Sequence, residues 1–204
     1  CDFFKQLSKY TNLKAKIRND ISDINYEKNI DHLILLPNKL KECLKEENKI
    51  QAMAKEFINA KGSMFLGRGL SYPIALEGAL KLKELSYLHA EGYPAGEMKH
   101  GPLALIEEGL PVIVIAPKDK YFEKTLSNMQ EVIARGGKIL FITDNKKELM
   151  NENIRFGIRV PSLSNLLIPI ILTAPLQLLA YHVALLKNCD IDKPRNLAKS
   201  VTVE

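Results

Sequence analysis

The spacing of hydrophobic and polar positions changes near residue 60 and divides the chain in two. In residues 33–60 apolar side chains recur at steps of three and four, which predicts an amphipathic helix. Residues 1–17 are also expected to be helical, whereas the polar, aperiodic residues 17–29 predict a connection across the surface. Because no strand pattern precedes residue 61, residues 1–60 are interpreted as a helical arm or linker from a preceding subdomain.

After this arm, short continuous apolar runs alternate with helical patterns. Continuous β-branched runs are typical of strands buried on both faces, and their alternation with helices predicts a parallel sheet covered on both sides. The sequence therefore predicts a doubly wound α/β fold over residues 61–187. Residues 188–204 form a tail that we expect to fray, because its composition is polar and aperiodic. The expected strands are residues 63–67, 111–117, 138–144 and 156–161, and the expected helices are residues 73–88, 119–135 and 163–187.

One apolar run approaches the length of a membrane span. Residues 166–186 come close to the ~20 residues that cross a bilayer, but they are interrupted by Pro169, Pro175, Gln177, Tyr181 and His182. We therefore expect a buried core helix and no membrane association.

The overall composition excludes several classes of function. The net charge of +5 comes from scattered lysines without an aromatic-interleaved basic stripe, so no nucleic-acid partner is expected. The three cysteines show no CxxC and no histidine at metal-ligand spacing, which favours a reducing compartment, the cytoplasm, and predicts no metal and no cofactor. Since the chain begins with Cys1 and not with methionine, we expect a piece of a longer protein.

Ligands of open α/β sheets collect at the carboxyl ends of strands, which points to the loops after Leu66, Ile115 and Ile142. The first loop, 67–73, has two glycines, a serine placed to cap the next helix and a proline near its first turn. It matches neither the dinucleotide fingerprint nor the phosphate-binding loop, so nucleotide binding is unsupported. An anion site at the helix start and an ordinary strand-to-helix turn both stay open.

The helix expected next carries a line of charged side chains. Glu77, Lys81 and Glu84 follow one another at steps of four and three, so they share one face. One interpretation is a solvent-facing row of salt bridges. The other is a proton-transfer group, in which a carboxylate partly withdrawn from water acts as a general base beside a lysine.

Residues 90–102, AEGYPAGEMKHGP, combine titratable side chains with glycines and prolines that are expected to prevent a plain helix or strand. His100 is held there by a stiff backbone and is poorly placed for a core; its pKa near 6.5 suits a proton shuttle. His32, His89 and His182 lie in helical or apolar contexts and are assigned structural roles.

The final residues, KPRNLAKSVTVE, form an ordinary tail by composition. Lys199 gains chemical interest only if the fold carries this tail to the sheet edge, where desolvation lowers the pKa of its amine.

Taken together, residues 62–117, the stretch LQLLAYHVALLKNCDIDKPRN and the final KPRNLAKSVTVE resemble the glucosamine-6-phosphate synthase family, the glutamine:fructose-6-phosphate aminotransferases. The first sixty residues match only in helical character. The resemblance implies two sugar-isomerase (SIS) subdomains behind a glutaminase domain, in a homodimer. This chain then holds the second SIS subdomain and the helical segment before it, and we expect it to be inactive alone.

The resemblance also implies a role for each matching residue. Glu84 matches the base that moves a proton between C1 and C2, and Lys81 the lysine one turn earlier in the same active site. His100 matches the ring-opening histidine, which the family contributes to the neighbouring subunit's site. Lys199 matches the lysine that forms a Schiff base with the open-chain ketose, and Ala198 a backbone contact to the sugar.

The implied reaction makes glucosamine 6-phosphate from fructose 6-phosphate and glutamine-derived ammonia. Two other functions stay open: a non-catalytic sugar-phosphate-binding regulator and a stand-alone phosphosugar isomerase. An imine-forming lysine is of no use to a sensor, and glutamine-dependent product formation separates the synthase from both.

Overall fold

A five-stranded, wholly parallel sheet organises the protein in the computed structural model, which describes residues 23–197. The strand order is β2-β1-β3-β4-β5. The strands are β1 (Gly62–Gly67), β2 (His89–Pro94), β3 (Pro111–Ile115), β4 (Lys138–Thr143) and β5 (Ile154–Arg159). The three central strands are buried along almost their whole length, as their continuous apolar runs require.

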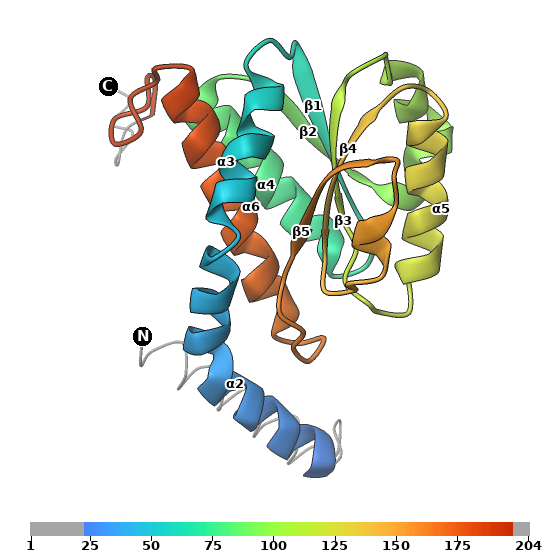
Figure 1. Cartoon of the computed structure of the whole chain (residues 1–204), viewed down its shortest axis with the longest axis vertical. Helices are drawn as coiled ribbons and strands as arrows, with labels where there is room; N and C mark the ends of the chain where they lie inside the picture. Colours follow the sequence, from blue (N-terminus) through green and yellow to red (C-terminus); the bar gives the residue numbers. More distant parts are fainter. Residues whose placement is uncertain (1–22, 198–204) are drawn as a thin grey trace, which may run out of the picture.

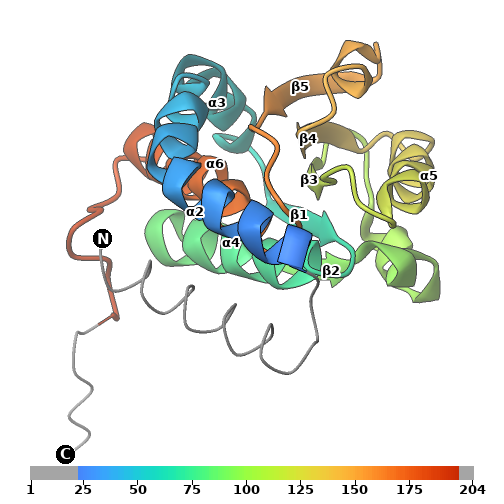
Figure 2. The ribbon, with the colours of Figure 1, turned by 90° about the horizontal axis from the view of Figure 1, so that it is seen from below.

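Helices cover both faces of this sheet, which confirms the doubly wound α/β class (Figure 1). One face carries α3, α4 and α6, while α5 packs on the other (Figure 2). The α-helices are α2 (Asp23–Leu44), α3 (Glu47–Ala54), α4 (Ser71–Ser86), α5 (Phe122–Ile133) and α6 (Ile168–Leu186). The short 3₁₀ helices are η1 (Lys55–Phe57), η2 (Ala95–His100), η3 (Pro102–Leu105) and η4 (Glu148–Met150).

Strand β2 corrects the expectation that residues 90–102 avoid regular structure. Its sequence, HAEGYP, has no apolar run, and only Ala90 is fully buried. The strand exists because its backbone pairs with β1 at the sheet edge, residue by residue from His89 to Pro94. Gly92 lets the strand approach α4, since a Cβ there would lie 2.9 Å from the Cα of Leu76. The rest of the stretch forms η2 and the beginning of η3.

The helical arm differs from its expected form in two ways. Helix α2 begins at Asp23, so the connection expected over 17–29 is wrong for its described part. Among residues 25–36 only Asn29 and Leu33 are buried, so the hydrophobic period in this part of the sequence is too weak to recognise. The helix expected over 33–60 is broken at Lys45–Glu46 and ends in η1. The helix expected over 1–17 lies outside the described residues.

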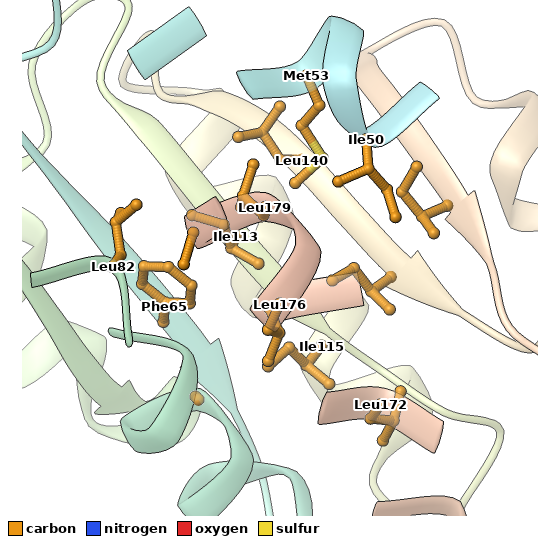
Figure 3. Close-up of a cluster of buried hydrophobic side chains, with 14 of the residues drawn as sticks. Ile50, Met53, Phe65, Leu82, Ile113, Ile115, Leu140, Leu172, Leu176 and Leu179 are labelled. Carbon is orange, nitrogen blue, oxygen red and sulfur yellow. The ribbon is translucent and has the colours of Figure 1, made fainter. Parts of the chain in front are cut away.

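The apolar run near the C-terminus forms α6, which lies in the core. By length and composition α6 is the one helix among the described residues that could cross a membrane, but 56% of its most apolar window is buried in the protein. Its buried side chains pack on α3, α4 and the sheet, and Pro175 is buried within it. Figure 3 shows the labelled side chains of this core: Ile50, Met53, Phe65, Leu82, Ile113, Ile115, Leu140, Leu172, Leu176 and Leu179. The prediction of a core helix is therefore confirmed.

Candidate functional site

A crevice opens at the carboxyl edge of the sheet, between the loops that follow β1 and β3. These strands are neighbours, and the chain leaves them in opposite directions, to β2 on one side and β4 on the other. Such a switch point is where open α/β sheets form ligand crevices. The cavity has a volume of about 460 Å³. It is lined by Gly69, Leu70, Ser71, Pro117, Asp119, Lys120, Tyr121, Asn165, Ile168, Pro169 and Leu172.

The turn between β1 and α4 shapes one wall of this crevice. Gly67 has no room for a side chain, since a Cβ would lie 2.2 Å from the carbonyl oxygen of Ser71. Gly69 has a φ of +54°, and a Cβ on it would lie 2.5 Å from the ring of Tyr121. Ser71 was expected to cap α4, but Leu70 occupies the cap position and no side chain caps the helix. Ser71 instead opens the helix and is 2% exposed.

Arg68 of the same turn points away from the crevice. Its guanidinium donates a hydrogen bond of 3.2 Å to Oδ1 of Asn128 on α5, and it lies 6.0 Å from the ring centre of Tyr121. Arg68 therefore ties the turn to α5, and the cation that lines the crevice is Lys120.

The charged row expected on α4 is present, and it lies toward the opposite, amino edge of the sheet. The Nζ of Lys81 is 2.6 Å from a carboxylate oxygen of Glu84 and 3.9 Å from one of Glu77. The side chains of Lys81 and Glu84 are 32% and 28% exposed. The hydrogen bond from Lys81 to Glu84 raises the pKa of the lysine, although partial burial opposes the rise. The pair therefore holds a permanent positive charge beside the carboxylate of Glu84.

The described part of the C-terminal tail returns to this same end of α4. Tyr87 follows the helix in the left-handed conformation, with a φ of 59°. Its hydroxyl oxygen accepts a 2.8 Å hydrogen bond from the backbone N–H of Arg195, and the Arg195 guanidinium lies 4.1 Å from the centre of its ring. The sulfur of Cys189 lies 3.9 Å from the carbonyl oxygen of Ser86. Residues 198–204, with Ala198 and Lys199, lie outside the described part of the chain.

His100 is separated from Lys81 and Glu84 within this chain. It closes η2, which follows the carboxyl end of β2, whereas Glu84 lies shortly before the amino end of that strand. The His100 side chain is 73% exposed, and its Nδ1 lies 2.7 Å from a carboxylate oxygen of Glu97. The prediction that His100 is not a core residue is confirmed.

The other three histidines have different surroundings. Nδ1 of His32 accepts a 2.7 Å hydrogen bond from the backbone N–H of Ser164, and burial is the main cause that lowers its pKa. His182 is 6% exposed, with Nε2 at 3.2 Å from Glu47. His89 was expected in a helical or apolar context, but it begins β2 with a side chain that is 72% exposed, 3.4 Å from Glu91.

Within residues 23–197 no cluster of three or more histidine, cysteine or acidic side chains could hold a metal ion. Cys43 and Cys189 are free thiols, and burial raises the pKa of Cys43 to about 11, so its thiol is unreactive at neutral pH.

Sequence reasoning missed Tyr87 and the far wall of the crevice. Tyr87 lies at the end of the helix expected over residues 73–88. Helices commonly end in a glycine, and the absence of one here was the signal that Tyr87 takes a special position. Asn165 and Pro169 line the crevice because the chain returns to this edge of the sheet after β5. No sequence pattern predicted this return.

The fold and the crevice define a doubly wound α/β domain with a ligand crevice at the switch point of its sheet. Comparison with known proteins assigns this domain to a family. The family described as SIS domain matches residues 56–187. The chain belongs to this SIS domain family.

Relatives with known names are similar over almost the whole chain. The glutamine–fructose-6-phosphate aminotransferase (isomerizing) of Bartonella henselae is 54% identical over 93% of this chain and 32% of its own length. That of Escherichia coli is 49% identical over 98% of this chain and 31% of its own length. The chain thus spans about a third of the length of the curated relatives it matches.

A solved structure agrees with these relatives. The C-terminal domain of glucosamine-fructose-6-phosphate aminotransferase from Francisella tularensis superposes with a TM-score of 0.85 at 43% identity, covering 90% of this chain and 52% of that one.

Proposed function

We propose that this chain is the second SIS subdomain of a glutamine–fructose-6-phosphate aminotransferase and supplies catalytic residues for its sugar-isomerising step. The observation that carries the proposal is the meeting of the tail with the end of α4, where Tyr87 binds Arg195 three residues after Glu84. The names of relatives at 49–54% identity support the same reaction. Fructose 6-phosphate is the proposed substrate and glucosamine 6-phosphate the product.

The anchored tail supports a role for Lys199 near Glu84. Lys199 follows Arg195 by four positions, and four residues of extended chain span at most ~14 Å. This reach is compatible with the role proposed for the Lys199 amine beside Glu84. Ala198 lies on the same short segment, which suits a backbone contact to the sugar.

The proposed chemistry needs an amine, a base and a ring-opening group. The Lys199 amine attacks the C2 carbonyl of the open-chain ketose and forms an imine with loss of water; glutamine-derived ammonia then displaces the lysine. Glu84 removes a proton from C1 and returns it to C2, while the hydroxyl proton on O1 passes to the imine nitrogen, so the imine becomes the 2-amino aldose. Lys81, whose pKa the hydrogen bond to Glu84 raises, stays protonated and holds the Glu84 carboxylate in place.

The position of His100 supports a homodimer. Since His100 and Glu84 lie at opposite ends of β2, one chain does not bring them into one site. His100 is exposed and free to enter the site of a neighbouring copy. We therefore propose that ring opening uses His100 of a second subunit, and that the glutaminase and first SIS domains of the parent chain complete the enzyme.

We also propose the cytoplasm as the location. The free thiols of Cys43 and Cys189 suit a reducing compartment, and the relatives' names describe metabolic enzymes.

The test replaces Glu84 by Gln in the full-length protein, with Glu77→Gln as the matched control. Glu77 lies on the same face of α4 but 3.9 Å from Lys81, against 2.6 Å for Glu84. Loss of a general base lowers turnover by ~10²–10⁴-fold, so sugar isomerisation should fall by that factor in Glu84→Gln while glutamine hydrolysis persists. Glu77→Gln should stay near the parent rate. Retained sugar turnover in Glu84→Gln would reject the role of Glu84, and turnover independent of glutamine would favour a stand-alone isomerase.

A further inference from the structure

The short helix η2, which ends at His100, has a buried side and an exposed side. Ala95 and Met98 are fully buried, in the cluster of apolar side chains that includes residues of α5. Lys99 reaches α5 itself, where its Nζ lies 3.1 Å from a carboxylate oxygen of Glu131. These contacts fix the backbone of η2 to the body of the protein.

The turn after β1 supports η2 from a second direction. The guanidinium of Arg68 lies so close to Gly96 that a Cβ on this glycine would be 3.0 Å from Nη2. The same guanidinium binds Asn128 of α5. Gly101, directly after η2, has a φ of +136°, a conformation that residues with a side chain rarely adopt. The backbone on both sides of His100 is therefore constrained, and the freedom that remains is in its side chain.

One contact restrains the imidazole ring itself. Its Nδ1 lies 2.7 Å from a carboxylate oxygen of Glu97, three residues earlier on η2. Residues three apart in a 3₁₀ helix stand on the same side, so the two side chains meet on the exposed surface of η2. A carboxylate only accepts hydrogen bonds, and Nδ1 therefore carries a proton in this contact. In the neutral ring the nitrogen without a proton is then Nε2.

The four histidines of the chain, all within the described residues, use their ring nitrogens differently. Nδ1 of His32 accepts a hydrogen bond from the backbone N–H of Ser164, so the proton of that neutral ring lies on Nε2. His89 and His182 face carboxylates with Nε2, at 3.4 Å and 3.2 Å. His100 alone among them combines an exposed ring with a carboxylate at Nδ1.

From this geometry we propose that Glu97 is a positioning residue for His100. The Glu97 carboxylate keeps the imidazole in its Nδ1–H form and leaves Nε2 available for proton transfer. The inference rests on the proposed function, in which His100 opens the sugar ring in the site of a second subunit, and it names a further residue for that step. A fixed backbone and a fixed ring together present Nε2 in one orientation, which proton transfer to a bound substrate requires.

Ring opening moves one proton between two oxygens of the sugar. Nε2 of His100 accepts the proton of the anomeric hydroxyl, the C2–O5 bond breaks as the C2 carbonyl forms, and Nε2 returns the proton to O5. Between these two transfers the imidazole is a cation, and the Glu97 carboxylate lies beside its positive charge. The proton on Nδ1 stays in place, and Glu97 does not touch the sugar.

The activity test compares two substrates of the full-length enzyme. Fructose 6-phosphate has to be opened, whereas 5-deoxyfructose 6-phosphate lacks the oxygen that closes the ring and is open from the start. Glu97→Gln should use fructose 6-phosphate about tenfold more slowly, the loss typical of one hydrogen bond to a charged group, and should use the 5-deoxy ketose like the parent. Glu107→Gln, an exposed carboxylate on the loop after η3, is the matched control and should use both like the parent.

The variant His100→Ala separates this inference from the proposed function. It should lose turnover of fructose 6-phosphate by at least as much as Glu97→Gln and retain turnover of the 5-deoxy ketose. If His100→Ala keeps the parent rate with fructose 6-phosphate, or loses both substrates equally, the ring-opening role of His100 fails, and the inference fails with it. If His100→Ala behaves as expected but Glu97→Gln matches the parent, or is slowed equally with both substrates, the positioning role of Glu97 alone is overturned.

A spectroscopic test needs no substrate. Nitrogen NMR of the chain with labelled histidine reports which ring nitrogen carries the proton at a pH where the rings are neutral, and only four rings contribute. His100 should carry it on Nδ1, with His32 as the internal reference for the Nε2–H form. Glu97→Gln should remove this preference at His100 and leave His32 unchanged. An Nε2–H form at His100 in the parent, or the same form of the ring with and without the carboxylate, overturns the proposal.

Discussion

The two edges of the sheet differ in how they are built. At the carboxyl edge, tight turns and the start of α6 surround a hollow of about 460 Å³. At the amino edge, charged side chains pair directly: Glu56 binds Lys138 and Arg155, and the end of α4 carries the Lys81–Glu84 pair and the Tyr87–Arg195 contact. One edge is shaped by close backbone approach and the other by ion pairs.

The switch-point rule for α/β sheets and the chemistry of the charged residues therefore indicate sites at opposite edges of the sheet. The switch-point rule locates the crevice correctly. Lys81 and Glu84, proposed for proton transfer, nevertheless lie toward the opposite edge, where the described residues leave their side chains partly exposed. In our proposal the tail and other domains complete this site.

The largest expected effect is on the turn at the carboxyl edge. Gly67→Ala should lower the free energy of unfolding by about 3 kcal/mol, because overpacking against backbone that cannot move is costly, and the new Cβ would lie 2.2 Å from the Ser71 carbonyl oxygen. Gly62→Ala, at the amino end of the same strand, is the control, with a nearest contact of 3.3 Å. Urea denaturation of both variants measures the difference. Equal stability would show that the two ends of β1 are not differently constrained.

A smaller effect is expected for the ion pairs at the amino edge. Glu56→Gln should cost about 2 kcal/mol of stability, since it weakens hydrogen bonds from two charged donors to a side chain that is 13% exposed. Glu42→Gln is the control, because Glu42 is 48% exposed in its pair with Lys39 and such pairs contribute little. Denaturation at neutral pH gives the comparison.

The same pair of variants should differ in pH dependence. Burial alone would raise the pKa of Glu56, but hydrogen bonds from Lys138 and Arg155 outweigh it and lower the pKa below 4.5. A lowered folded pKa means that the stabilisation is fully present above the unfolded value and is lost as pH falls through the folded value. Glu56→Gln should therefore remove part of the acid sensitivity that Glu42→Gln retains. An unchanged acid transition would contradict the assignment.

The smallest effect concerns the tail. Tyr87→Phe keeps the ring under Arg195 but removes the oxygen that accepts its backbone N–H. Hydrogen exchange of the Arg195 amide should accelerate by about fivefold, which corresponds to ~1 kcal/mol for one hydrogen bond. Tyr181→Phe, on an exposed part of α6, is the control and should leave this amide unchanged. If Tyr87→Phe exchanges like the parent, Tyr87 does not hold the tail.

Several parts of the fold were predictable from local pattern. The runs of β1, β3 and β4 are apolar throughout because these strands are covered on both faces, and α6 is apolar because it packs in the core. Strand β2 was missed because an edge strand is held by backbone pairing and needs no apolar run. Residues 25–32 of α2 were missed because Asn29 is the one buried side chain among them, which is too little to create a hydrophobic period.

The candidate site likewise has one part that local pattern predicted and one part that it did not. The spacing of Lys81 and Glu84 predicted their contact, since residues three apart on a helix are neighbours. The contact of Tyr87 with Arg195 joins positions 108 apart, and no local pattern contains it. The tail, which its composition expects to fray, therefore has an anchor that only the fold reveals.

Local sequence patterns were enough to predict the class of fold, the helix that carries the charged row and the loops able to bind a ligand, because burial and helical spacing are local properties. The folded structure places the crevice at one edge, brings the end of α4 and the described part of the tail together toward the other, and separates His100 from Glu84 by the length of β2. These relations depend on the order of the strands and on where the chain reverses direction. Backbone pairing and packing then bring together residues that are distant in the sequence, so no single stretch of the chain predicts them.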